Sequence, residues 1–181
     1  MLFDETVKWK ILVRFFEEPE KELYVKELAR KLKISPGSAS SMCRELEKEH
    51  ILRSEEKGRA LFYSLRNDEP FVRRLKSAWF LDVLMGFRGC WENGEIQSAA
   101  LYGSRASGEF ISKSDVDILL ISNADKKELE KGVERMRKRF GEGLTLTIFS
   151  IAEWRGMRKE RFYTEVLSNH VLLHGSPLVV G

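Results

Sequence analysis

The feature that most constrains the fold is a Gly-Ser turn between two strand-like runs, with two aspartates at the start of the second run. Residues 96–102 (IQSAALY) and 116–121 (VDILLI) are short apolar runs typical of buried strands. Gly103-Ser104 follows the first run, and after ten intervening residues Asp115-Val116-Asp117 opens the second. Strand-like and helical segments continue to alternate, which predicts an α/β unit with a small mixed sheet. The later segments are a helix over 124–140, a strand over 144–149, a helix over 151–167 and a final strand over 170–175.

The residue types in this turn suit a phosphate group and a metal ion. Gly103 allows backbone N–H groups to approach an anion closely, Ser104 adds a hydroxyl donor, and a helix starting near Arg105 would direct its N-terminus at the same anion. Asp115 and Asp117 lie two apart on a strand, so they point to the same side and can share Mg²⁺. A phosphate loop beside a carboxylate pair is the arrangement used in phosphoryl or nucleotidyl transfer.

The segment LYGSRASGEFISKSDVDILLI resembles the GSx10DxD signature of the minimal nucleotidyltransferases in the DNA polymerase beta-like superfamily. The resemblance extends over roughly residues 70–175. It implies that Gly103 and Ser104 hold a nucleoside triphosphate, and that Asp115 and Asp117 are the catalytic residues that bind the Mg²⁺ cofactor. Arg105 is a further nucleotide-binding candidate because it could reach a phosphate, although it could equally be a surface charge.

The resemblance also implies a third carboxylate on the next strand, and the sequence departs from it there. Alternation along residues 143–149 (GLTLTIF) leaves Thr145 and Thr147 on the polar face. Threonine is a neutral, weak metal ligand, so a two-metal mechanism would lose charge neutralisation. Glu142 could substitute only after a shift in strand register. Whether the domain is an active enzyme or a degenerate domain that binds nucleotide or serves as a scaffold is therefore left open.

The N-terminal third has the spacing of a helix-turn-helix followed by a hairpin. Helical periodicity covers 4–16 and 24–32, and Ser35-Pro36 then offers an N-cap and first turn for a third helix. Its predicted buried stripe is Ala39, Cys43 and Leu46. Strand-like runs at 51–55 and 61–65 enclose a turn with glycine and basic residues. The whole of residues 4–68 resembles the winged helix-turn-helix domains of prokaryotic transcription regulators.

The outer face of the third helix and the hairpin tip would form a surface for double-stranded DNA. The candidate DNA-binding residues are Ser38, Ser40, Ser41, Arg44, Lys57 and Arg59. Bulk charge gives this prediction little support, because residues 1–70 contain 14 Lys and Arg against 14 Asp and Glu. Packing or dimerisation is therefore the alternative role for this domain.

A polar break at Asn67-Asp68-Glu69-Pro70 predicts the domain boundary. We expect a DNA-binding domain over 1–70 and a nucleotidyltransferase-like domain over 71–181, with a connecting helix at 71–88. Residues 79–85 of this helix are apolar nearly all round, which predicts deep burial or a homodimer interface.

Composition excludes several other classes. The net charge of +3 is too small to identify a nucleic-acid binder by itself. Cys43 and Cys90 have neither disulfide-framework nor zinc spacing. Residues 1–10 lack the apolar stretch of a signal peptide, and no window resembles a membrane span. A cytoplasmic protein without membrane contact is expected.

Together these observations predict an α+β chain, with a winged helix-turn-helix domain followed by the mixed-sheet domain. The leading hypothesis is a DNA-binding transcriptional regulator whose nucleotidyltransferase-like domain binds nucleotide and Mg²⁺. One alternative is an active Mg²⁺-dependent nucleotidyltransferase that transfers AMP to a small molecule or a partner protein, as antitoxin members of the family do to HEPN-type toxins. Another is a nucleotide-sensing or scaffold protein.

Overall fold

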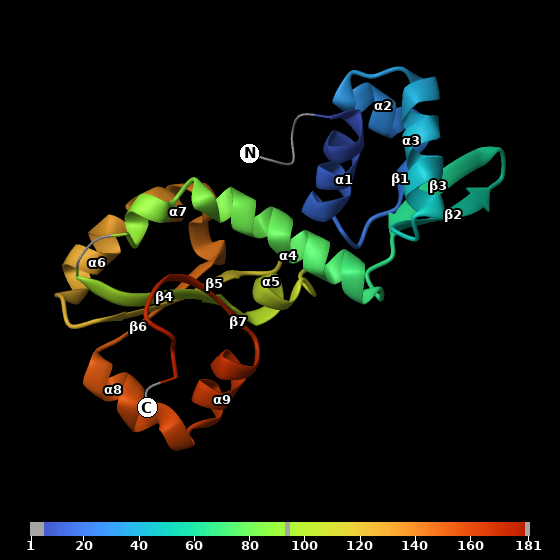
Figure 1. The fold of residues 1–181 in the computed structure, drawn as a ribbon. Coiled ribbons are helices and arrows are strands. Elements are labelled where there is room, and N and C mark those ends of the chain that lie inside the picture. Colours follow the sequence, from blue (N-terminus) through green and yellow to red (C-terminus); the bar gives the residue numbers. More distant parts are fainter. Residues whose placement is uncertain (1–5, 93–94, 180–181) are drawn as a thin grey trace. The chain divides into compact units, whose positions relative to one another are not determined.

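The computed structural model describes residues 6–92 and 95–179, and the chain divides into two compact units (Figure 1). Unit 1 comprises residues 1–82 together with 110–112, and unit 2 comprises 83–109 and 113–181. The division falls inside helix α4 (Pro70–Met85), whereas the polar break at residue 70 marks the start of that helix. A short segment between the Gly-Ser turn and the two aspartates therefore belongs to unit 1.

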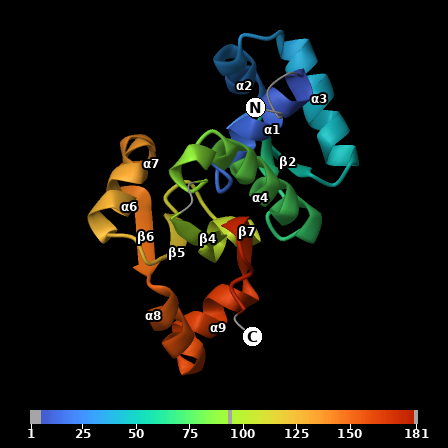
Figure 2. The ribbon, with the colours of Figure 1, turned by 60° about the vertical axis from the view of Figure 1, so that its left-hand side comes forward.

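Unit 1 contains the helices before α4, the larger part of α4 and a small antiparallel sheet, which Figure 2 shows from a second direction. The helices before α4 are α1 (Val7–Glu17), α2 (Val25–Leu32) and α3 (Pro36–Lys48). The strands are β1 (Leu23–Tyr24), β2 (Leu52–Lys57) and β3 (Ala60–Leu65), in the spatial order β1-β3-β2. Residues 4 and 5 of the helix predicted over 4–16 lie outside the described residues, and Thr6 caps α1 in the structure.

Local sequence explains how α2 turns into α3. Lys33 adopts a left-handed conformation (φ 55°, ψ 42°) and its N–H closes the last turn of α2. Ser35 then caps α3, because its hydroxyl accepts a hydrogen bond from the N–H of Ser38 at 3.0 Å. The predicted stripe of Ala39, Cys43 and Leu46 is confirmed, since all three side chains are fully buried. Burial raises the pKa of the Cys43 thiol to about 12, so this cysteine is a packing residue.

A buried lysine attaches the 110–112 segment to α4 within unit 1. The Lys76 ammonium donates hydrogen bonds to the Phe110 carbonyl and to Asn67 Oδ1, each at 2.9 Å. Its side chain is 1% exposed, and its Nζ lies 4.6 Å from the centroid of the Phe110 ring. Nearby, the N–H of Ser112 donates to the carboxylate of Glu20 at 3.1 Å. These charge-assisted hydrogen bonds fix the segment in place.

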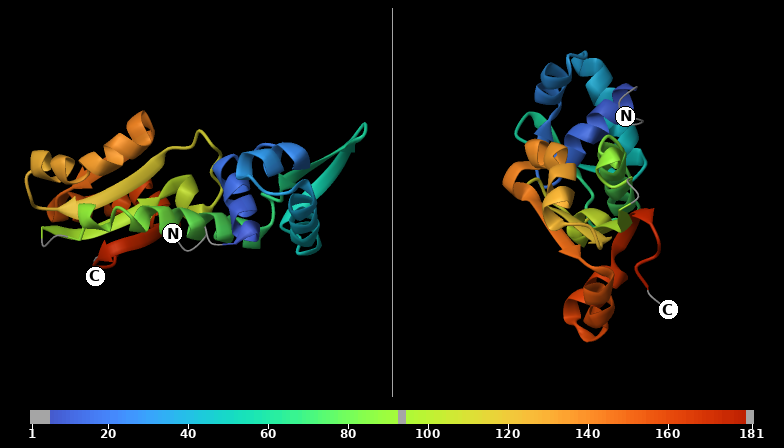
Figure 3. Two further views of the ribbon diagram at one scale, coloured as in Figure 1. Left: turned by 90° about the horizontal axis from the view of Figure 1, so that it is seen from above. Right: turned by 90° about the vertical axis from the view of Figure 1, so that its left-hand side faces the viewer.

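Unit 2 is built on a small mixed sheet, as predicted, and its four strands lie in the order β6-β5-β4-β7 (Figure 3). Only β5 and β6 are parallel; the other two pairings are antiparallel. The strands are β4 (Ile96–Tyr102), β5 (Val116–Ser122), β6 (Leu144–Phe149) and β7 (His170–Gly175). The helices are α5 (Gly103–Ser107), α6 (Lys126–Gly132), α7 (Glu134–Phe140), α8 (Ile151–Gly156) and α9 (Arg161–Ser168).

Two helices that the periodicity predicts as continuous are each divided. The helix expected over 124–140 breaks at Val133, directly after Gly132, a residue of low helix propensity. The helix expected over 151–167 is interrupted by the 3₁₀ turn Met157–Lys159 and by Glu160, whose backbone is extended. The second break gives α9 a direction of its own.

The two faces of the unit 2 sheet are covered by different helices. Leu119 and Ile121 of β5 pack in one buried cluster with Trp154 of α8 and with Tyr163 and Val166 of α9. Helices α6 and α7 lie on the opposite face (Figures 1 and 2). Because side chains alternate along a strand, Asp117 shares the α9 face with Leu119.

Within residues 6–92 and 95–179, no helix has both the length and the apolar character that crossing a membrane requires.

We expect Gly175→Ala to destabilise the protein more than Gly141→Ala. Both glycines have positive φ angles, +81° and +61°, which are strained for any residue with a Cβ. A Cβ on Gly175 would also lie 1.9 Å from the carbonyl oxygen of Gln97, whereas one on Gly141 would meet nothing within 4 Å. Gly141→Ala should cost about 1–3 kcal/mol of backbone strain, and Gly175→Ala more than about 3 kcal/mol. Urea unfolding measures both, and equal losses would contradict this account.

Candidate nucleotide site

The centre of the site is a close approach between the Gly-Ser turn and the second aspartate. Gly103 begins α5 with φ +70°. A Cβ at this position would lie 2.5 Å from Oδ2 of Asp117. Both the backbone conformation and the space therefore require glycine, and the predicted Gly103 and Asp117 are brought into direct contact. Helix α5 begins two residues earlier than predicted and is only five residues long.

The sheet places three polar side chains in one row across neighbouring strands. Asp117 of β5 is in register with Tyr102 of β4 and with Thr145 of β6. Asp115 precedes β5 and is exposed, while Asp117 is partly buried. Burial, and then the negative charge of Asp115, raise the pKa of Asp117. A divalent cation between the two carboxylates would relieve this repulsion, so the pair fits Mg²⁺.

Arg105 supports the loop that carries the aspartates. Its Nε donates to the carbonyl of Asp115 at 3.0 Å, and Nη2 donates to the carbonyl of Ser114 at 2.7 Å. Burial lowers the pKa of Arg105, with the charges of Asp117 and Asp115 acting in the opposite direction. The guanidinium thus holds the backbone at the start of β5, and a phosphate contact by Arg105 stays a prediction.

The described residues contain no group of three His, Cys, Asp or Glu side chains that could hold a metal ion. Thr145, opposite Asp117, is exposed and neutral. The hydroxyl of Thr147 shares a hydrogen bond with that of Tyr102 at 3.0 Å. Glu142 is exposed in the 3₁₀ turn Gly141–Gly143 and joins no such group. The site is thus a two-carboxylate site flanked by hydroxyl groups.

A pocket of about 400 Å³ opens beside the Gly-Ser turn, between α5 and α9. Its lining residues are Tyr102, Gly103, Ser104, Ser107, Glu109, Phe162, Glu165, Val166, Ser168 and Asn169. The amide of Asn169 donates to the carbonyl of Gly103 at 3.2 Å and so ties the end of α9 to the turn. Sequence reasoning identified Gly103 and Ser104 but missed Phe162, Glu165 and Asn169. In the sequence, the sign of these residues is an aromatic residue, Phe162, three positions before a carboxylate, Glu165. This spacing is common on surface helices, so it did not indicate a pocket.

The predicted DNA-binding residues all lie in unit 1, whereas the residues that line the pocket belong to unit 2. Ser41 and Arg44 are exposed on α3, and Arg59 is exposed at the β2–β3 turn. The ammonium of Lys57 pairs with the carboxylate of Glu22 and lies 3.5 Å from that of Glu55. Ser38 and Ser40 are partly buried.

Comparison with protein families agrees with this geometry. Residues 87–165 match the family model described as the nucleotidyltransferase domain. This part of the chain is a nucleotidyltransferase-like domain. The matched range contains the turn, both aspartates and most of α9. The predicted domain type is therefore confirmed, while no curated protein matches the chain.

Several solved structures align with parts of this chain at low similarity. A protein described as a possible transcriptional regulator from Methanosarcina mazei Go1 is 17% identical, with a TM-score of 0.35 over 49% of this chain and 80% of that one. The AntR antimony-specific transcriptional repressor is 19% identical, with a TM-score of 0.38 over 47% and 74%. A toxin–antitoxin structure with AMP-PNP is 15% identical, with a TM-score of 0.34 over 55% and 73%.

We expect Asp117→Asn to stabilise the metal-free protein by about 0.5–1 kcal/mol. Folding raises the pKa of this carboxyl, so its ionisation disfavours the folded state and stability falls as pH rises through its titration range. The neutral amide removes that cost. Thermal unfolding at neutral pH measures the effect, with the exposed Glu130→Gln as a charge-matched control. Mg²⁺ should raise the melting temperature of the wild type but not that of Asp117→Asn. If the metal-free Asp117→Asn variant were less stable than the wild type, burial and repulsion from Asp115 would not be what destabilises the folded protein at this position.

Proposed function

We propose that the nucleotidyltransferase-like domain binds a nucleoside triphosphate together with a single Mg²⁺. The observation that carries this proposal is the contact between Gly103 and Asp117 at the edge of the α5–α9 pocket. Because Gly103 has no Cβ, the space next to the Asp117 carboxylate stays open. Phosphate oxygens can therefore approach a cation that this carboxylate binds. The donor set fits the ion, because Mg²⁺ prefers carboxylate and phosphate oxygens.

Each residue of the site has a distinct role in this proposal. Asp115 and Asp117 hold Mg²⁺, which when bound neutralises phosphate charge. Gly103 and Ser104 contact the phosphates through backbone N–H groups and a hydroxyl. Arg105 positions the aspartates by holding the carbonyls of Ser114 and Asp115.

We further propose that nucleotide transfer by this domain is slow at best. Two-metal transfer uses two cations to stabilise the attacking and leaving oxygens. Thr145, in register with Asp117, and Thr147, two residues further along β6, supply only hydroxyl groups to hold a second cation. Incubation of the protein with labelled nucleoside triphosphates and Mg²⁺ tests this directly. Rapid labelling of the protein, an added partner or a small acceptor would overturn it.

We expect Thr145→Asp to raise the number of bound Mn²⁺ ions from one to two per chain. The new carboxylate would lie in register with Asp117 on the exposed edge of β6, where it could complete a second metal site. Isothermal titration with Mn²⁺, in the presence of a non-hydrolysable nucleotide, measures the stoichiometry. Thr145→Asn is the matched control, because it has the same shape without the charge. A single ion in Thr145→Asp would show that this position does not face the metal site.

A second function, DNA binding by unit 1, is supported by the outer face of α3. We propose that unit 1 is a winged helix in which α3 enters the major groove and the β2–β3 hairpin contacts the backbone. The cap at Ser35 fixes the start of α3, and its apolar stripe turns Ser41 and Arg44 outward. The ion pairs of Lys57 with glutamates reduce its availability to phosphates, so Arg44 and Arg59 carry more of the contact.

We expect Arg44→Ala and Arg59→Ala each to weaken duplex binding. Each phosphate contact that is lost should lower the slope of log affinity against log salt by about 1. Fluorescence anisotropy with a labelled duplex at several salt concentrations measures both quantities. Lys138→Ala, an exposed cation in unit 2, serves as control. Unchanged affinity in both arginine variants would reject this surface.

A further inference from the structure

The α5–α9 pocket has two chemically different ends. At one end are Gly103 and Ser104, next to the carboxylate of Asp117. At the other end are side chains of α9, including Phe162 and Glu165, while Asn169 lies beside the turn, where its amide donates to the Gly103 carbonyl. A volume of about 400 Å³ is within the range of small-molecule sites. The pocket therefore has room for more of a ligand than its phosphates.

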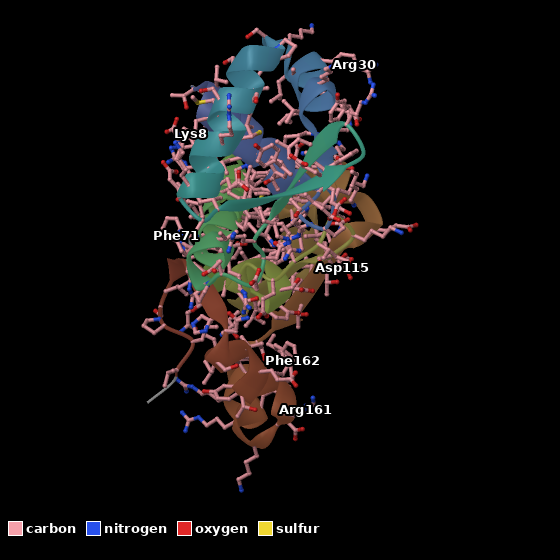
Figure 4. The ribbon with its side chains drawn as sticks, turned by 90° about the vertical axis from the view of Figure 1, so that its right-hand side faces the viewer. Lys8, Arg30, Phe71, Asp115, Arg161 and Phe162 are labelled. Atoms are coloured by element: carbon pink, nitrogen blue, oxygen red, sulfur yellow. The ribbon has the colours of Figure 1, made fainter. Side chains whose placement is uncertain are left out.

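Charge separates the two ends of the pocket. Its lining includes the carboxylates Glu109 and Glu165 and, among the described residues, neither lysine nor arginine. Arg161, labelled next to Phe162 in Figure 4, pairs with Glu165 one turn further along α9 at 2.6 Å, and its side chain is 91% exposed and does not line the pocket. Like charges repel strongly where solvent is partly excluded. Glu109 lies at the turn end, because its N–H donates to the carbonyl of Ser104 at 2.9 Å. Mg²⁺ bound by Asp115 and Asp117 would offset the repulsion of a triphosphate at that end, whereas the α9 end has no such cation and suits an uncharged group.

Phe162 provides an apolar surface for such a group. Its ring packs edge-on against Tyr102 at a centroid distance of 5.6 Å and against Phe149 at 6.1 Å. These contacts hold the ring in one orientation while it still lines the pocket. Aromatic side chains held in this way stack on nucleobases with little dependence on sequence.

The carboxylates that line the pocket are hydrogen-bond acceptors, Glu165 at the α9 end and Glu109 at the turn end. Glu109 and Glu165 accept only, and Asn169 already uses its amide group to donate to the carbonyl of Gly103. These side chains therefore suit a ligand that brings its own donors. In a nucleoside, the donors are the ribose hydroxyl groups, the amino groups of adenine, cytosine and guanine, and the ring N–H groups of guanine and uracil.

We propose that the α9 end of the pocket is the nucleoside subsite, where Phe162 stacks on the base and Glu165 accepts a hydrogen bond from the ribose or the base. This inference rests on the proposed nucleotide-binding function and extends it to the choice of nucleotide. In this proposal, α9 selects ribonucleotides or nucleotides whose base carries an amino group. Phe162 and Glu165 are the residues that determine this specificity.

Calorimetric titration of the full chain with Mg²⁺ and either ATP or inorganic tripolyphosphate tests this inference separately from the proposed binding of a nucleoside triphosphate, on which it rests. We expect ATP to bind at least tenfold more tightly than tripolyphosphate. Equal affinities would overturn the nucleoside subsite and leave the phosphate site standing. Failure of both ligands to bind would overturn the proposed function itself.

Variants then locate the subsite. Phe162→Ala should abolish the preference for ATP over tripolyphosphate, whereas Phe162→Tyr should keep it. Retained tripolyphosphate binding shows that each variant is folded. If Phe162→Ala keeps the wild-type preference for ATP, the stacking role is wrong.

The role of Glu165 is tested by the choice of nucleotide. Wild-type protein should prefer ATP over either 2′-deoxy-ATP or purine riboside triphosphate, which lacks the 6-amino group, by about fivefold or more. The weaker of these two ligands identifies the ribose or the amino group as the donor. Glu165→Gln should reduce that preference, while Arg161→Gln, which breaks the same ion pair but keeps the carboxylate, should not. Equal binding of all three nucleotides by the wild type, or an equal effect of both variants, would overturn the assignment.

Discussion

The contact between Gly103 and the carboxylate of Asp117 is the constraint on which the rest of the site depends. It requires a residue without a Cβ at the end of β4, and it fixes how closely the turn approaches β5. Asp117 consequently stays partly buried beside a second carboxylate, with a raised pKa. The free site is therefore electrostatically unfavourable, which is a common property of sites that bind cations.

Much of this arrangement could be predicted from the sequence because it depends on local spacing. Strand alternation and the ten-residue interval predicted the turn and its two aspartates, and alternation on β6 predicted the threonines at the third position. In unit 1, the Ser35 cap and the stripe through Cys43 likewise depend only on neighbours along one helix.

The parts that could not be predicted depend on the path of the chain between elements. The break at Gly156–Glu160 redirects α9, which brings Phe162 and Asn169 to a turn about sixty residues earlier in the chain. Periodicity alone indicated one continuous helix there. Arg105 could be assigned to phosphate or to solvent from the sequence, but its bonds to two backbone carbonyls required the folded loop.

The position of Phe110–Ser112 has a consequence for how the chain can be divided. Because these residues belong to unit 1, the chain passes from one unit to the other more than once, and no single cut separates the two units. A truncated chain starting at Val83 would lose Lys76 and Trp79, the α4 residues against which the buried Phe110 ring packs. It would expose that ring within the interval that joins Ser104 to Asp115. A recombinant fragment of this kind would therefore tend to aggregate. Weak nucleotide binding by such a fragment would reflect the disturbed segment between Ser104 and Asp115, and it would not test the site itself.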